Sequence, residues 1–252
     1  MARKNVVIVT GIVSSVLELK KQIDGTVVGR FRLTIGRNGF PGSDRPMIEV
    51  GGEALNFMKQ IQVGSYLHIE GELHTRIIQY RKECPACHSV VEKDILATTI
   101  YTEKIIPFAL SETSFHQNNV FLLGHVVRKP AVFQTKRGIP KTKYQMVIKR
   151  HIGAKTTGLE SDYPYVVSYK RLGQQDALRI MEGSMIFVQG AIQSVEKEIP
   201  VVCSVCSFTQ TPKVNLVEIV CKSTEYLHGC NFPENEDPNH WEVLKIQRQL
   251  RV

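Results

Sequence analysis

The chain has 252 residues, of which 42% are hydrophobic, so it can form one large or two small domains with packed cores. Its formal net charge of +8 favours polyanionic partners such as nucleic acid. It contains no apolar run of about 18 residues, so we expect no membrane-spanning helix, and its N-terminal residues alternate like a strand rather than forming a signal peptide.

The first part of the chain is predicted to form a series of strands interrupted by one short helix. Residues 5–13 are rich in β-branched side chains, which favours a buried strand. Residues 26–37 alternate between apolar and polar side chains, and we predict that Phe31, Leu33 and Ile35 face the core. The remaining elements predicted in this part are a strand at 47–50, a helix at 53–62, a strand at 64–76 and a strand at 95–106.

The second part of the chain repeats this order. Gly64 to Arg76 reads GSYLHIEGELHTR and Gly183 to Val195 reads GSMIFVQGAIQSV, a spacing of 183 − 64 = 119 residues. The equivalent elements are strands at 119–127, around 144–148, at 165–169, at 183–195 and at 214–222, with a helix at 174–182. Self-similarity at a nearly fixed offset indicates a duplicated domain. We therefore predict domains at 1–110 and 115–228, followed by a C-terminal extension, 229–252, with a short helix.

Each copy has the order strand, strand, strand, helix, strand, strand, which is the order of the oligonucleotide-binding barrel, a five-stranded Greek key. We therefore predict an all-β fold of two tandem oligonucleotide-binding barrels. The segments NNVFLLGHVVRKPAVFQTKRGIPKTKYQMVIKR and YKRLGQQDALRIMEGSMIFVQGAIQS resemble the bacterial single-stranded DNA-binding protein family. The first copy matches that family more loosely through NVVIVTGIV and FRLTIGRN, and the tandem arrangement resembles the two-barrel version of the family.

The resemblance implies a protein that coats single-stranded DNA during replication, transfer or repair in the bacterial cytoplasm, associated with the nucleoid. It also extends to primosomal replication protein N, a related barrel with few tryptophans. Two features depart from the family pattern. The chain ends in the basic KIQRQLRV instead of an acidic tail, and its one tryptophan, Trp241, lies outside both copies. Alternative functions are a tandem-barrel primosome or assembly factor, with a replication or mobile-element protein as partner, and a zinc-containing RNA-binding protein. A homodimer is also possible.

Binding single strands without sequence preference requires a cationic groove for phosphates and aromatic faces for stacked bases. Basic residues concentrate on the second strand of each copy and on the strands and turns beside it. Aromatic residues lie near places where the family stacks bases. The predicted nucleic-acid-binding residues are Arg30, Arg32, Arg37, Phe40, Arg76, Tyr80, Arg81, Lys136, Arg137, Lys143, Lys149, Arg150, Tyr163, Tyr169, Lys170 and Arg171.

Four of the six cysteines form two Cys-x-x-Cys pairs at equivalent places in the two copies, each between the fourth and fifth strands. Two thiolates at this spacing can reach one zinc ion, which takes four ligands in structural sites. The simplest prediction is one zinc shared by Cys84, Cys87, Cys203 and Cys206. The alternatives are a separate site in the second copy, completed by Cys221 and Cys230, or pairs that bind no metal. No Walker, GxSxG or HExxH sequence occurs, so we predict no enzymatic activity.

Overall fold

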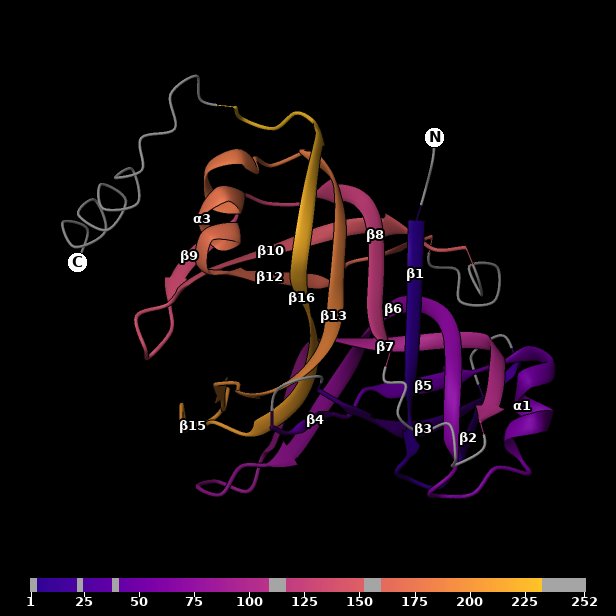
Figure 1. Ribbon diagram of the computed structural model, residues 1–252. Coiled ribbons are helices and arrows are strands. Elements are labelled where there is room, and N and C mark those ends of the chain that lie inside the picture. The colour runs from indigo at the N-terminus through magenta and orange to yellow at the C-terminus, as the bar shows by residue number, and fades with distance from the viewer. Residues whose placement is uncertain (1–3, 22–24, 38–40, 109–116, 152–159, 233–252) are drawn as a thin grey trace.

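The computed structural model describes residues 4–21, 25–37, 41–108, 117–151 and 160–232 (Figure 1). The predicted boundary at 110–115 and the predicted C-terminal helix lie outside these ranges. None of the helices in the described ranges has the length and apolar character needed to cross a membrane.

The all-β prediction and the tandem order of elements are confirmed. In the first repeat, the main elements are β1 (Lys4–Val13), β3 (Val27–Gly36), β5 (Met47–Val50), α1 (Gly52–Met58), β6 (Tyr66–Glu83) and β7 (Val90–Phe108). In the second repeat, they are β8 (Asn118–Val126), β10 (Pro140–Lys149), β12 (Tyr165–Tyr169), α3 (Lys170–Arg179), β13 (Met185–Glu198) and β16 (Lys213–His228). The short strands are β2 (Glu18–Lys21), β4 (Ser43–Asp44), β9 (Ala131–Gln134), β11 (Ser161–Asp162), β14 (Val201–Val202) and β15 (Thr209–Gln210).

In each repeat, five strands pair in a closed ring. β1 pairs with β3, β3 with β5, β5 in parallel with β7, β7 with β6, and β6 with β1. The same ring in the second repeat runs β8, β10, β12, β16, β13 and back to β8, again with one parallel pair. Alternating side chains fill the interior, and the predicted inward-facing residues Phe31, Leu33 and Ile35 are buried, as are Tyr144, Met146 and Ile148.

The helix α3 begins four residues earlier than predicted. The prediction rested on the helical spacing of Ala177, Leu178 and Met181, which does not mark the first turn. In the structure Gly173 lies inside the helix, where its backbone approaches the Ser168 carbonyl so closely that a Cβ atom would lie 2.8 Å from that oxygen. The close packing of α3 on β12 therefore outweighs the low helix propensity of the residue.

The two repeats are joined by equivalent strands. β1 pairs antiparallel with β8, and Val7 lies opposite Val120. These residues are 120 − 7 = 113 positions apart, the same offset that separates Gly11 from Gly124 in the first strands. The pair therefore lies on a local two-fold axis that relates the repeats, so the chain contains the kind of self-complementary interface found in symmetric dimers.

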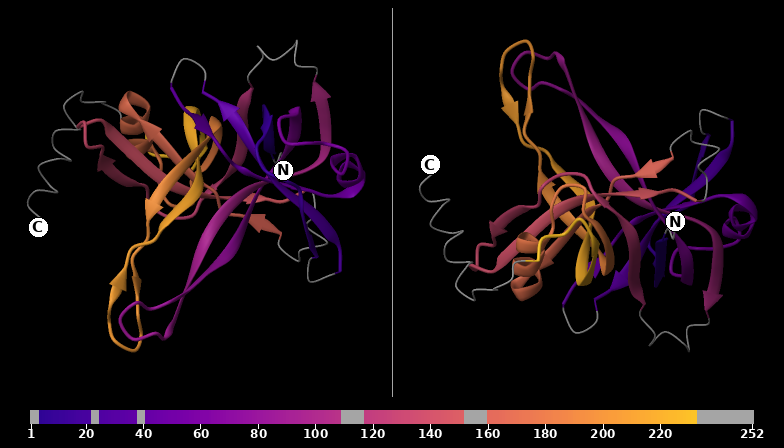
Figure 2. Two further views of the ribbon diagram at one scale, coloured as in Figure 1. Left: turned by 90° about the horizontal axis from the view of Figure 1, so that it is seen from below. Right: turned by 90° about the horizontal axis from the view of Figure 1, so that it is seen from above.

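The fourth and fifth strands of each repeat continue far beyond the barrels. We call residues 76–97 of the β6–β7 hairpin the first arm and residues 195–216, between the outer parts of β13 and β16, the second arm. The paired ends of these segments are Arg76 with Ala97 and Val195 with Leu216. Figure 2 shows the two arms running side by side away from the body of the molecule in both views.

Candidate nucleic-acid interface and metal centre

The four predicted cysteine ligands meet at the tips of the two arms. Their sulfur atoms all lie within 4.8 Å of one another. The Sγ atoms of Cys84 and Cys206 are 3.6 Å apart, and so are those of Cys87 and Cys203. Four sulfurs around a tetrahedral zinc, each about 2.3 Å from the ion, are about 3.8 Å apart. The arrangement can therefore hold one metal ion with two ligands from each repeat.

The two cysteine turns have the same backbone geometry. In the first, the Cys84 amide donates to the Ser89 carbonyl over 2.8 Å, and His88 has a φ of 61°. In the second, the Cys203 amide donates to the Phe208 carbonyl over 2.9 Å, and Ser207 has a φ of 60°. Each turn thus folds its two sulfurs toward the same side, as a shared centre requires.

The hydroxyl of Ser89 lies between sulfurs from different arms. Its Oγ is 3.0 Å from Cys87 Sγ and 3.2 Å from Cys203 Sγ. The hydrogen bond from Ser89, together with backbone amides of the second turn, lowers the pKa of Cys203 to about 6. A lowered pKa favours the thiolate, which is the form that binds metal.

A small apolar cluster packs beside the cysteines. It contains Val91 and Val201, and Tyr80 packs against it. The Tyr80 hydroxyl is 3.5 Å from Gln210 Oε1 on the other arm, and Lys93 donates to the Pro200 carbonyl. Tyr80, predicted to stack on bases, therefore lies in the contact between the arms.

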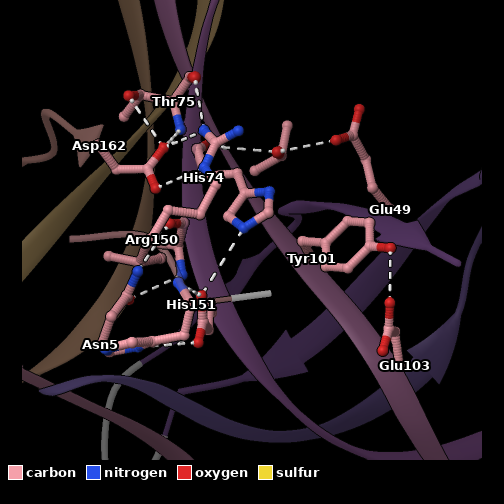
Figure 3. Close-up of polar contacts among 12 residues, drawn as sticks. Asn5, Glu49, His74, Thr75, Tyr101, Glu103, Arg150, His151 and Asp162 are labelled. Atoms are coloured by element: carbon pink, nitrogen blue, oxygen red, sulfur yellow. Dashed lines mark hydrogen bonds and ion pairs between the residues drawn. The ribbon is translucent and has the colours of Figure 1, made fainter. Parts of the chain in front are cut away.

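A second contact between the repeats lies where the arms leave the barrels. The Asp162 carboxylate accepts the Thr75 amide over 2.5 Å (Figure 3). The Tyr163 amide donates to Thr75 Oγ1 over 2.9 Å. Arg150 supports the carboxylate, with its Nε 2.9 Å from Asp162 Oδ2 and a further bond to the Thr75 carbonyl. Arg150 and Asp162 are both buried.

The same contact is repeated on the other side of the two-fold axis. The Asp44 carboxylate accepts the Ser194 amide over 2.8 Å, and the Arg45 amide donates to Ser194 Oγ over 2.8 Å. Arg37 binds Asp44 through two hydrogen bonds of 2.7 and 3.0 Å. Arg37 and Arg150, both predicted to bind nucleic acid, are thus placed in the contacts between the repeats.

These aspartates were not predicted as functional residues, although the sequence carries a signal for them. Both repeats contain Ser-Asp-x-Pro, at residues 43–46 and 161–164. A short polar motif kept in both copies of a diverged repeat indicates a role that both copies share. Here that role is to hold the arm of the other repeat.

A buried glutamate pairs with the basic face of the first repeat. Glu49 Oε1 lies 2.8 Å from Arg30 Nε and 2.6 Å from Arg76 Nη1. Glu49 is buried, whereas the two arginine side chains retain about a quarter of their exposure, 24% and 25%. One carboxylate therefore neutralises only part of the charge that the two predicted residues bring together.

The second repeat contains a comparable cluster, but its carboxylate comes from the fifth strand instead of the third. Glu218 lies 2.7 Å from Lys143 Nζ and 3.7 Å from Lys141 Nζ, and it also pairs with Lys197. Burial alone raises the pKa of Glu218, but hydrogen bonds from Lys143 and Lys197 outweigh that effect and lower it. Neither Glu49 nor Glu218 was identified from the sequence, because their pairing depends on strand neighbours that are far apart in the chain.

Lysines and tyrosines lie against one another on the outer face of β10 and β12. Lys143 Nζ is 4.1 Å from the ring centroid of Tyr165, and Lys141 Nζ is 5.5 Å from that of Tyr169. Lys197 Nζ, on β13, approaches Tyr165 at 6.0 Å. We call Lys141, Lys143, Tyr165, Tyr169 and Lys197 the lysine–tyrosine face. Tyr165 was not among the predicted site residues, although it alternates with Val166 in a strand that was predicted.

The remaining predicted residues are spread over the surface. Tyr163 is 41% exposed and lies beside the buried Asp162. Arg81 pairs with Glu92 on the first arm at 3.0 Å. Phe40 lies outside the described residues. The other predicted basic residues are exposed, and they are Arg32, Lys136, Arg137, Lys149, Lys170 and Arg171.

No protein-family model matches the chain, and no curated protein matches it by sequence. Its structure resembles that of the wild-type single-stranded DNA binding protein from Thermus aquaticus, with a TM-score of 0.61, 14% identity, and coverage of 95% of this chain and 99% of the other. A deletion and substitution variant of that protein gives a TM-score of 0.64 at 16% identity, covering 93% and 100% of the two chains. Over nearly its whole length, the chain therefore has the tandem all-β fold of these single-stranded DNA binding proteins.

Proposed function

We propose that this protein binds single-stranded DNA with little sequence preference, as part of replication, transfer or repair, and has no catalytic activity of its own. The observation that carries the proposal is the lysine–tyrosine face. Single-strand binding needs aromatic faces for bases next to cations for phosphates, and here Lys143 and Lys197 both lie close to the ring of Tyr165. The whole-chain similarity in fold to proteins named for binding single-stranded DNA supports the same function.

In the proposed complex, tyrosines bind the bases of the strand and basic side chains bind its phosphates. Bases stack on Tyr165 and Tyr169, each stacked base contributing about 1–3 kcal/mol. The lysines of the face, together with the exposed Lys149, Lys170 and Arg171, bind the phosphates. Because Glu218 already neutralises part of this charge, the face attracts a strand without presenting an uncompensated cluster of lysines.

The experiment is a titration of the full chain against labelled oligothymidylate, a duplex of the same length and an oligouridylate, each at several salt concentrations. The proposal predicts preference for oligothymidylate over duplex, and contact with about six phosphates corresponds to a slope of roughly −4 in log affinity against log salt. Equal affinity for the duplex, or no salt dependence, contradicts the proposal. Tighter binding of oligouridylate assigns the protein to RNA.

We further infer that the cysteine cluster holds a structural zinc ion through Cys84, Cys87, Cys203 and Cys206. Sulfur spacings close to those of a tetrahedral site and matching turn geometry support this inference. Four protein ligands leave no open position for substrate, so the ion serves to fix the two arms to each other. Besides the cysteines, the contacts described between the arms are a small apolar cluster and a few hydrogen bonds, including those from Tyr80 and Lys93.

A further inference from the structure

A cleft of about 110 Å³ lies between the first barrel and the base of the second arm. By the same measure, one water molecule needs about 10–15 Å³, so the cleft has room for a small ligand group. Three arginines of the first repeat line it, namely Arg32, Arg45 and Arg76. Its opposite wall comes from the second repeat, with Ser194 and Asn215 among the polar residues. The cleft therefore exists only because the two repeats are docked together.

The positive charge at this cleft exceeds the negative charge beside it. Arg76 shares the Glu49 carboxylate with Arg30. Within the described part of the chain, Arg32 and Arg45 have no carboxylate partner, and Arg32 Nη1 reaches only the Arg45 carbonyl, at 3.4 Å. Four guanidinium groups and one carboxylate give 4 − 1 = +3, so an anion in the cleft would meet an attractive field.

One nitrogen atom of Arg76 lacks a hydrogen-bond acceptor. Its Nε is buried and has no hydrogen-bond partner. Burial, and then the nearby charge of Arg30, lower the pKa of Arg76 against the opposing effect of Glu49. A buried donor without an acceptor costs free energy, and an anion bound nearby would offset the charge of this incompletely paired guanidinium.

The cleft is specific to one side of the molecule. In the second repeat, the positions equivalent to Arg32, Arg45 and Arg76 are occupied by Gln145, Tyr163 and Val195. The other junction therefore lacks all three guanidinium groups, although it is built by the same backbone contacts. Because the same backbone contacts form at the junction that lacks these arginines, docking of the repeats does not require the three guanidinium groups.

We propose that this cleft, which we call the junction pocket, binds a phosphate group of the nucleic-acid strand where the strand passes between the two repeats. Arg32 and Arg45 would bind the phosphate oxygens, and the guanidinium of Arg76, which also lines the pocket, would add to the positive charge that attracts them. Arginine suits this task because its planar donors match phosphate geometry. The assignment of this phosphate to a nucleic-acid strand rests on the proposed single-strand function. The preference of the pocket for phosphate does not depend on that function.

The first test uses inorganic pyrophosphate and thermal unfolding of the full chain. The variants are the double substitution Arg32→Gln and Arg45→Gln, and a control with Lys59→Gln and Lys104→Gln, two basic residues that do not line the pocket. We expect pyrophosphate to raise the unfolding midpoint of the wild type and the control but not that of the double arginine variant. An equal rise in all three proteins, or no rise in the wild type, overturns the proposal.

The second test identifies the source of the phosphate. In the double arginine variant, the slope of log affinity for oligothymidylate against log salt should be less negative by about 0.7, which is the value for one phosphate on a single strand. An unchanged slope, with wild-type binding intact, overturns the assignment to the strand. If the wild type binds no oligothymidylate but responds to pyrophosphate through the arginines, the single-strand function fails and the pocket is a free-phosphate site.

Discussion

Asp162 of the second repeat accepts the backbone amide of Thr75 in the first, and the equivalent aspartate, Asp44, accepts the amide of Ser194 in the opposite direction. Each repeat thus holds the arm of the other at its base. The β1–β8 pairing and the cysteine cluster join the repeats as well. Together these contacts fix the two barrels relative to each other.

The two junctions are equivalent in geometry but differ in burial, which predicts unequal costs of mutation. Asp162→Asn removes the carboxylate that pairs with the buried guanidinium of Arg150 and should lower the free energy of unfolding by about 3 kcal/mol. Asp44→Asn should cost about 1 kcal/mol, because the Arg37 side chain keeps 31% of its exposure and water can replace part of the pair. Denaturant unfolding of both variants measures the difference. Equal costs would contradict the unequal burial.

The duplicated fold could be predicted because its signals are local and repeat at nearly fixed offsets. The alternation around Phe31 and Tyr144, the glycine-led fourth strands and the two Cys-x-x-Cys pairs are each readable within about a dozen residues. The shared cysteine cluster also follows from the duplication, since equivalent loops on two equivalent barrels can meet on the axis that relates them.

The functional surface was harder to predict because it depends on partners that are distant in the chain. Arg150 and Lys143 both appear as basic residues near the end of an alternating strand, yet one is buried against Asp162 and the other is half-buried beside Tyr165. Charge alone does not separate these two environments. Glu218 pairs with Lys143 across 75 residues of sequence, and the ring closure of the strands, not a local pattern, brings the two together.

Glu218→Gln should have opposite effects on stability and on binding. The substitution removes the carboxylate that Lys141, Lys143 and Lys197 share, so the three ammonium groups repel one another and the fold loses about 3 kcal/mol. If these lysines bind phosphates, affinity for oligothymidylate rises, because the competing carboxylate is gone. Fluorescence anisotropy at low temperature, where the variant stays folded, measures the affinity. A decrease in affinity would argue against the lysine–tyrosine face.

The same residue predicts a dependence of stability on pH. The folded-state pKa of Glu218 lies below its ordinary value of 4.5, so its ionised form stabilises the fold above that pH. As the pH falls below about 4.5 and then through the lower folded-state pKa, the carboxylate takes up a proton and this stabilisation is lost. The free energy of unfolding should therefore fall more steeply with acidification in the wild type than in Glu218→Gln. Parallel acid profiles would contradict this reasoning.

The role of Tyr165 can be tested with two substitutions at one position. Tyr165→Phe keeps an aromatic ring beside Lys143 and should retain most of the affinity for oligothymidylate. Tyr165→Leu keeps an apolar side chain but removes the stacking surface, and should cost about 1–3 kcal/mol of binding free energy. Binding isotherms at one salt concentration compare the two. If Tyr165→Leu binds as tightly as Tyr165→Phe, bases do not stack at this position.

The cysteine cluster makes a prediction that separates a shared ion from two independent sites. If one zinc joins the arms, Cys84→Ser and Cys203→Ser should each remove most of the metal measured by elemental analysis, although they change different repeats. Cys221→Ser is the matched control, because Cys221 is a buried cysteine of the second repeat outside the cluster. Removal of the metal from the wild type with a chelator should increase proteolytic cleavage within residues 76–97 and 195–216. The barrels should stay protected, because the ion contacts the arms and not the barrels. Loss of about half the metal in each variant would instead assign one ion to each repeat, and metal loss in Cys221→Ser would place the ligands elsewhere.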